Sequence, residues 1–164
     1  MASEKSSTFN YVIVGLLVLN LGITSYLAIR PSSSSATTEP AKTKVDVSES
    51  EAGRLADEVV KLYNTKDNVG LFAKFDNLAK AQMSQEQLTA QLNKLYPLIG
   101  TISDAAFSDA VLAGSNGGRD YYNLNYKVRL TGGPFNTGDM KLTVIRRESG
   151  LSLIGFFING TSHQ

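Results

Sequence analysis

The chain has 164 residues, of which 16 are Lys or Arg and 15 are Asp or Glu, so its net charge is close to zero. This length fits one domain with an appendage, and the charge balance excludes a protein that binds nucleic acid through a strong excess of cations. Cysteine is absent and the one histidine is the next-to-last residue, His163, which excludes disulfides, thiolate metal sites and cysteine nucleophiles.

An apolar stretch without an internal charge predicts a transmembrane helix over residues 11–30. As an α-helix its uncharged part is roughly 28 Å long, close to the thickness of a bilayer's hydrocarbon core. Tyr11 and Tyr26 lie near its ends, where aromatic rings prefer the interface, and Arg30 closes the span with a charge that can reach the headgroups. The alternative, a cleaved signal peptide, has a shorter apolar core and requires a small residue where Tyr26 stands. We therefore expect an uncleaved anchor.

Two features of this span concern association and orientation. Asn20 lies mid-span, where it either hydrogen-bonds a neighbouring helix or is a single tolerated amide, the interpretation we favour. Lys5 in the N-terminal tail (residues 1–10) and Arg30 after the span place cations on both sides, so the positive-inside rule does not decide the orientation. A short tail before a large domain is the usual signal-anchor layout. We expect a domain outside the cytoplasm, either in the periplasm or on the outer face of the cell membrane.

Residues 31–44 read PSSSSATTEPAKTK and contain no large apolar residue. A segment of this composition cannot bury a core, so it predicts a flexible tether. The remaining residues, 45–164, then form the soluble domain.

The first half of this domain has the pattern of helices. A capping-box pattern, which marks a helix start, occurs twice. These motifs are Ser48 with Glu51 and Ser84 with Gln87. Apolar residues at helical spacing follow both starts, and a further short helix is expected over residues 69–79. Gly100 is expected to end the last helix, and Pro97 to bend or end it early.

The second half changes to the two-residue period of β-strands. Alternating or apolar runs are separated by turn signals rich in Gly, Asn and Ser. The predicted strands cover residues 105–113, 121–130, 140–145 and 151–158. Because helices come first and strands afterwards, the sequence predicts an α+β fold with a mostly antiparallel meander.

The last predicted strand is apolar on both faces, with Leu151, Leu153 and Phe157 on one of them. A strand of this kind is buried on both sides. The second side is a candidate dimer or covering surface, made of Ile154, Phe156 and Ile158. A second subunit, or loops and the C-terminal tail, can supply the cover.

Three helices followed by a curved antiparallel sheet resemble the nuclear transport factor 2-like (cystatin-like) superfamily. The segment SGLSLIGFFING resembles its common final strand, and SQEQLTAQLNKLYPLIG resembles the third helix of small bacterial members without an assigned function. The resemblance covers residues 49–159 and implies a cone-shaped pocket between sheet and helices, with frequent sheet-to-sheet dimers. The final strand departs from the pattern in having Leu151 near the place of a frequent Trp.

Enzymes of that superfamily place an Asp/His or Asp/Tyr set in the pocket. The resemblance makes four tyrosines candidate pocket residues here: Tyr63, Tyr96, Tyr122 and Tyr126. Asp76, Asp104 and Asp109 are the candidate acids, since a carboxyl in an apolar pocket can act as a base or a donor. The alternative, which we favour, is that the tyrosines fill a core and the aspartates cap helices and turns.

Four cations on two neighbouring strands form a candidate basic face: Lys127, Arg129, Lys141 and Arg147. Such a face would suit an anionic partner, namely a lipid headgroup, an acidic protein surface or a glycan. The alternative is a solvated face neutralised by acidic neighbours such as Asp139 and Glu148.

Phosphate loops, metal-ligand spacings and nucleophile elbows are absent from the sequence. We expect no metal and no cofactor. The function that we expect is a membrane-anchored, non-enzymatic interaction or assembly module, with the bilayer as one partner and a second copy or another envelope protein as the next. The alternatives are a domain that binds a small apolar ligand and, less favoured, an enzyme of the isomerase or dehydratase kind.

Overall fold

The computed structural model describes residues 47–161 of the chain. The predicted N-terminal tail, membrane span and tether lie outside the described residues, and with them Tyr11, Asn20, Tyr26 and Arg30. Within residues 47–161, none of the helices combines the length and the apolar character that a bilayer crossing requires.

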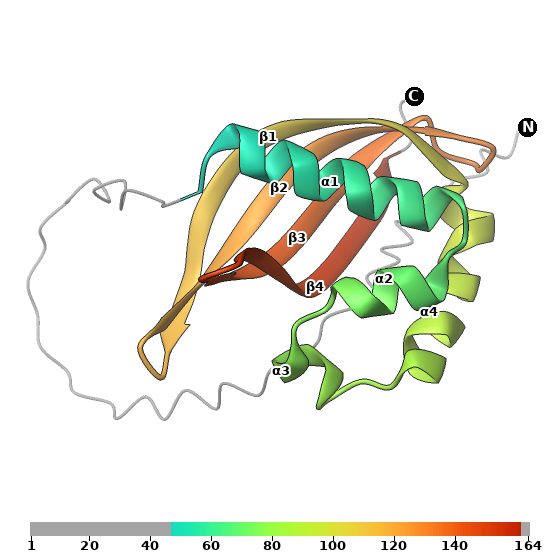
Figure 1. Ribbon diagram of the computed structural model, residues 1–164. Coiled ribbons are helices and arrows are strands. Elements are labelled where there is room, and N and C mark those ends of the chain that lie inside the picture. Colours follow the sequence, from blue (N-terminus) through green and yellow to red (C-terminus); the bar gives the residue numbers. More distant parts are fainter. Residues whose placement is uncertain (1–46, 162–164) are drawn as a thin grey trace, which may run out of the picture.

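Helices precede a single sheet (Figure 1). The helices are α1 (Glu49–Asn64), α2 (Asn68–Lys74), α3 (Asn77–Lys80) and α4 (Gln85–Ile99). The strands are β1 (Thr101–Asn116), β2 (Arg119–Thr131), β3 (Thr137–Arg147) and β4 (Gly150–Thr161). Each strand is antiparallel to the next, in the order β1-β2-β3-β4, and the sheet is not closed. This confirms the predicted α+β class and its antiparallel meander.

The helix ends follow local sequence signals, with one difference. Both predicted capping boxes are present, at Ser48 and at Ser84, and Gly100 ends α4 with a positive φ of 71°. Pro97 does not end this helix early, since α4 continues to Ile99. Proline removes one intrahelical hydrogen bond, and in the last turn the burial of Ile99 offsets that loss.

The helix predicted over residues 69–79 is in fact two helices. α2 ends at Lys74, Phe75 is extended, and the Asp76 side chain caps α3. The reason is a contact with a segment that is distant in the sequence. Phe75 forms a parallel bridge with Leu153 of β4, and the Asp76 N–H donates to the Leu153 carbonyl at 2.7 Å. This pairing with the edge of the sheet interrupts the helix and covers the edge of β4 at Leu153.

The core lies between the helices and one face of the sheet, which α1 crosses (Figure 1). The predicted alternation holds in β2 and β3, because one residue in two is buried against the helices. These inward residues are Tyr122, Leu124, Tyr126, Val128 and Leu130 of β2, and Met140, Leu142 and Val144 of β3. The residues between them point to the other side of the sheet, which we call the outer face.

A bulge in β4 changes the face assignment that we expected for the last strand. Thr143 pairs with Gly155 but Val144 pairs with Leu153, so Ile154 is an extra residue. An extra residue reverses the alternation beyond it. Phe156 therefore lies on the same side as Leu153. Ile158 follows it into the core, so these residues form no exposed dimer surface. Ile154 is also buried, outside the main core cluster.

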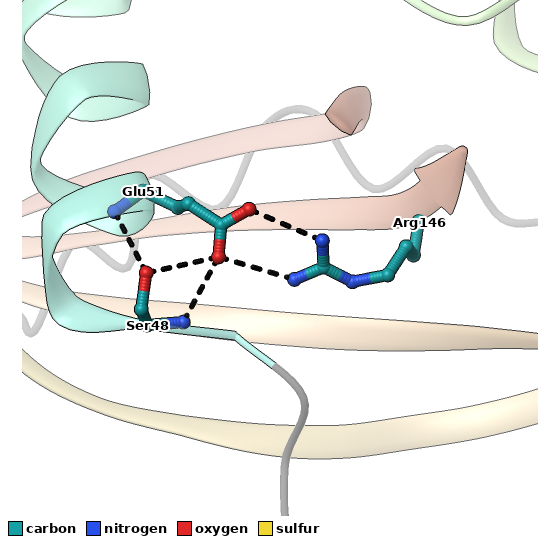
Figure 2. A network of polar contacts seen from close by, with 3 residues as sticks. All are labelled: Ser48, Glu51 and Arg146. Atoms are coloured by element: carbon teal, nitrogen blue, oxygen red, sulfur yellow. Dashed lines mark hydrogen bonds and ion pairs between the residues drawn. The ribbon is translucent and has the colours of Figure 1, made fainter. Parts of the chain in front are cut away.

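Three residues join the start of α1 to the end of β3 (Figure 2). The Arg146 guanidinium donates to both carboxylate oxygens of Glu51, at 3.1 and 3.3 Å. The Ser48 hydroxyl donates to the same carboxylate at 2.9 Å, and the Glu51 N–H donates back to that hydroxyl. A bidentate contact of this kind fixes the direction in which the chain enters the domain.

This network predicts a dependence of stability on pH. Hydrogen bonds from Arg146 and from Ser48 lower the pKa of Glu51 from 4.5 to about 2. A lowered pKa in the folded state adds stability that is present above pH 4.5 and is lost as the pH falls towards 2. Glu51→Gln should therefore be less stable than wild type at pH 6, and the difference should shrink between pH 5 and pH 2. Urea denaturation across this range measures it, with Glu49→Gln as a control in the same helical turn. A difference that stays constant would contradict the pairing.

Candidate functional site on the outer sheet face

The predicted pocket tyrosines lie in or beside the core. Tyr63, Tyr122 and Tyr126 are buried among the core residues, and Tyr96 is half-buried beside them. The Tyr126 hydroxyl donates to the Ala52 carbonyl of α1 at 2.9 Å. The Tyr63 ring lies 5.0 Å from that of Tyr96, measured between centroids. These are the packing contacts of a core.

The electrostatic surroundings of two of these tyrosines favour the neutral phenol. Burial raises the pKa of Tyr63 above its usual value, and the neighbouring Tyr96 acts in the same direction. Burial also raises the pKa of Tyr126, with a further contribution from Asp57. A phenol that keeps its proton at neutral pH cannot act as a base. The hydroxyl proton of Tyr126 is already used in its bond to α1.

The candidate acids lie elsewhere. Asp76 accepts two hydrogen bonds from Arg147, at 2.7 and 2.9 Å, and these bonds hold the pKa of its carboxyl below the usual value. Asp104 and Asp109 are exposed on β1, opposite Arg129 and Asn125 of β2. None of the three makes a hydrogen bond to a tyrosine within residues 47–161. The acid that does influence a core tyrosine is Asp57 on α1, which sequence reasoning did not single out.

The candidate basic face is smaller and less cationic than the sequence suggested. Arg147 leaves it, because its guanidinium binds Asp76 at the start of α3. Lys127 forms an ion pair with Asp139 of β3, with Nζ and Oδ1 2.6 Å apart. Arg129 and Lys141 remain, and in the described part of the chain neither has an acidic group within ion-pair distance. The outer face is therefore a mixed surface with both signs of charge.

A hollow of about 340 Å³ lies in this outer face and spans all four strands. Its lining consists of Ser108, Asp109, Asn125, Tyr126, Lys127, Asp139, Met140, Lys141 and Phe157. A bulge in β1 between Phe107 and Asp109 leaves Ser108 without a partner in β2 and places it at the rim. Bulges often occur beside functional sites, where they redirect a side chain.

The polar groups of the hollow are held by their neighbours across the strands. The Asn125 amide donates to Asp109 at 2.7 Å. The Lys141 ammonium lies 5.5 Å from the centroid of the Phe157 ring, within the range of a cation–π contact. Together with the Lys127–Asp139 pair, these groups offer donors, acceptors and one apolar ring to a partner.

Sequence reasoning named several residues of this hollow for separate reasons, and did not group them: Lys127, Lys141 and Asp139 at a basic face, Asp109 and Tyr126 as pocket candidates, and Phe157 as an apolar residue of the last strand. It did not single out Ser108. Only the register of the sheet brings them together, since Asp109, Asn125, Lys141 and Phe157 face one another in a single row. A matching alternation in four consecutive strands is the signal that predicts such a row.

Neither a protein-family model nor a curated protein matches the chain. Within residues 47–161, no group of three or more His, Asp or Glu side chains is arranged to hold a metal ion.

Proposed function

We propose that the protein is a membrane-anchored, non-enzymatic interaction module that binds its partner on the outer face of the sheet. In this proposal the helix over residues 11–30 holds the domain at the bilayer, on the side away from the cytoplasm. The proposal also gives the domain the cone-shaped arrangement of the nuclear transport factor 2-like superfamily, with Tyr63, Tyr122 and Tyr126 packed in its core.

One observation carries the proposal: the tyrosines that would line a catalytic pocket are packed in the core, whereas a hollow lined by charged, amide and aromatic side chains is open on the opposite face. The inner face offers Tyr126 already bonded to Ala52. The outer face offers Lys141, a cation without an acidic partner among the described residues, beside the ring of Phe157. A mixed polar and aromatic surface is typical of a protein interface, where exposed cations also guide the approach of an acidic partner.

Substituting two of the three buried tyrosines tests the claim that these side chains belong to the core. Tyr126→Phe is expected to cost about 1 kcal/mol of unfolding free energy, because it removes the hydrogen bond to Ala52. Tyr63→Phe is expected to be neutral or slightly stabilising, because the Tyr63 hydroxyl has no hydrogen-bond partner among the described residues. Urea denaturation followed by circular dichroism measures both. A loss above about 2 kcal/mol for Tyr63→Phe would show that this hydroxyl serves another group.

A charge reversal tests the other part of the proposal, namely that a partner binds on the outer face of the sheet. The tagged full-length chain is purified from its native membrane after chemical crosslinking, as wild type, Lys141→Glu and the control Lys94→Glu. Lys94 is an exposed cation on α4, away from the sheet. We expect a discrete crosslinked partner with wild type and with Lys94→Glu, and its loss with Lys141→Glu. Equal yields from all three proteins, or no partner with wild type, would overturn the proposal.

A further inference from the structure

The chain contains two Asn-Gly pairs, and the structure places them in contrasting surroundings. Asn116-Gly117 lies at the tip of the β1–β2 hairpin, where Asn116 pairs with Arg119 and the turn between them has two residues. Asn159-Gly160 lies within β4 and is paired with β3. An asparagine followed by glycine loses its side-chain amide more readily than other asparagines, because glycine has no side chain to obstruct the backbone nitrogen that attacks it.

The first pair is accessible at the tip of the hairpin. Asn116 and Gly117 are exposed, and within residues 47–161 neither the Asn116 side chain nor the Gly117 N–H makes a hydrogen bond. Gly117 and Gly118 have φ values of 59° and 71°, the sign that a type I′ turn requires. The hairpin extends beyond the helices at this end (Figure 1), and among the described residues none from 111 to 121 belongs to the core cluster. The tip can therefore open without disturbing the core.

The second pair is held by the sheet. The Asn159 side-chain oxygen accepts a hydrogen bond from the Asp139 N–H at 3.0 Å. Gly160 pairs with Gly138 of β3 and lies so close to the Phe135 ring that an added Cβ would stand 2.2 Å from it. Attack by the Gly160 nitrogen on the Asn159 side chain therefore requires β4 to separate from β3. Strands that pack on a core open only at a free energy close to that of global unfolding.

We propose that Asn116 is a site of spontaneous deamidation in the folded protein. The backbone nitrogen of Gly117 loses its proton and bonds to the side-chain carbonyl carbon of Asn116, and the bond from that carbon to the side-chain nitrogen breaks, so that ammonia leaves. The cyclic imide that remains takes up one water molecule and opens to aspartate or isoaspartate. Water is the only co-reactant, and nothing is oxidised or reduced.

The modification changes the charge and the main chain at the tip. The new carboxylate lies near that of Asp120, which accepts a hydrogen bond from the Ser115 hydroxyl. Isoaspartate also adds a methylene group to the main chain, so position 116 cannot keep its pairing with Arg119 across a two-residue turn. The inference does not rest on the proposed function, because no residue of the tip lines the hollow on the outer face.

Peptide mass spectrometry of the full-length chain, kept in detergent at mildly alkaline pH, tests the proposal. Deamidation replaces an NH2 group by OH, and the resulting change in mass is followed over time at both asparagines. We expect conversion at Asn116 to be at least about tenfold faster than at Asn159, because the tip opens more readily than the strand. The same measurement in urea is the control: both pairs are then unfolded, and their rates should become similar.

A variant and an isotopic label test the chemical route. Asn116→Gln should abolish the fast conversion, because the longer side chain would have to close a larger ring, and circular dichroism verifies that the variant is folded. In water enriched in ¹⁸O, aspartate and isoaspartate should both form, each with one labelled oxygen. Equal rates at Asn116 and Asn159 in the folded protein, or a faster conversion at Asn159, overturn the proposal. Aspartate without isoaspartate also overturns it, because that result excludes the cyclic imide.

Discussion

Replacing Phe156 by Ala is expected to lower the free energy of unfolding by about 4 kcal/mol, the cost typical of removing a buried phenyl ring. The Phe156 side chain is 1% exposed and belongs to the core cluster. Its ring centroid lies 5.8 Å from that of Tyr63 on α1, so it joins the last strand to the first helix. The loss combines buried apolar surface with the cavity that remains.

The neighbouring residue provides the matched control. Phe157 lies on the outer face under the Lys141 ammonium, and Phe157→Ala is expected to cost about 1 kcal/mol. The measurement is urea denaturation of the full-length chain in detergent, followed by circular dichroism at two protein concentrations. A larger loss for Phe157→Ala than for Phe156→Ala would show that the bulge at Ile154 does not reverse the faces. A midpoint that rises with protein concentration in wild type and not in Phe156→Ala would show that Phe156 stabilises a subunit interface.

Gly100→Ala is the second substitution with a large expected effect, also about 4 kcal/mol of destabilisation. Gly100 connects α4 to β1 with φ 71° and ψ −131°, a conformation that costs an L-residue about 1–3 kcal/mol. A Cβ there would lie 2.2 Å from the Thr131 carbonyl oxygen and 2.7 Å from the Gly133 nitrogen. Both are backbone atoms, so the loop after β2 has to move away from the end of the helix.

Gly53→Ala is the control for this prediction. Gly53 lies inside α1, and nothing stands within 4 Å of the position that its Cβ would take. Alanine is the better helix former, so this substitution should stabilise the domain by about 0.5–1 kcal/mol. Both variants are measured by urea denaturation. Equal stabilities for Gly100→Ala and wild type would contradict the close approach of the loop to α4.

Local signals in the sequence were sufficient to predict much of the fold. Ser48 and Ser84 mark helix starts because their side chains bond to backbone groups only three residues away. The alternation in β2 predicts its buried face because one side of the sheet packs on the helices. Gly100 marks the end of the last helix because few other residues adopt a positive φ.

The differences came from contacts between distant segments. Phe75 breaks the second predicted helix by pairing with Leu153, and no short-range pattern indicates that bridge. The bulge at Ile154 appears only in the pairing of β4 with β3. A constant alternation along the apolar run of β4 therefore predicts the wrong face for Phe156. Residue type alone assigns Arg147 to a basic face. Its partner in the structure is Asp76, which lies in the helical half of the chain.

The same reason limits how well the candidate site could be predicted. Residue type was sufficient to single out Lys127, Lys141 and Asp109 as candidate site residues, because charged residues on strands usually face solvent. Their meeting with Phe157 in one hollow depends on the register of three strand pairs. A resemblance based on apolar spacing directed attention to the inner face, where Tyr63, Tyr122 and Tyr126 are buried in the core.

Photocrosslinking from position 125 tests the central claim, an outer face that binds a partner, most directly. Asn125 lines the hollow, and a photoreactive amino acid in its place, in the full-length chain in its native membrane, samples whatever occupies it. We expect one discrete crosslinked species from position 125, its loss when Lys141→Glu is added to the same chain, and no such species from position 94. An absence of crosslinks from position 125, or the same crosslinks from both positions, would contradict the claim.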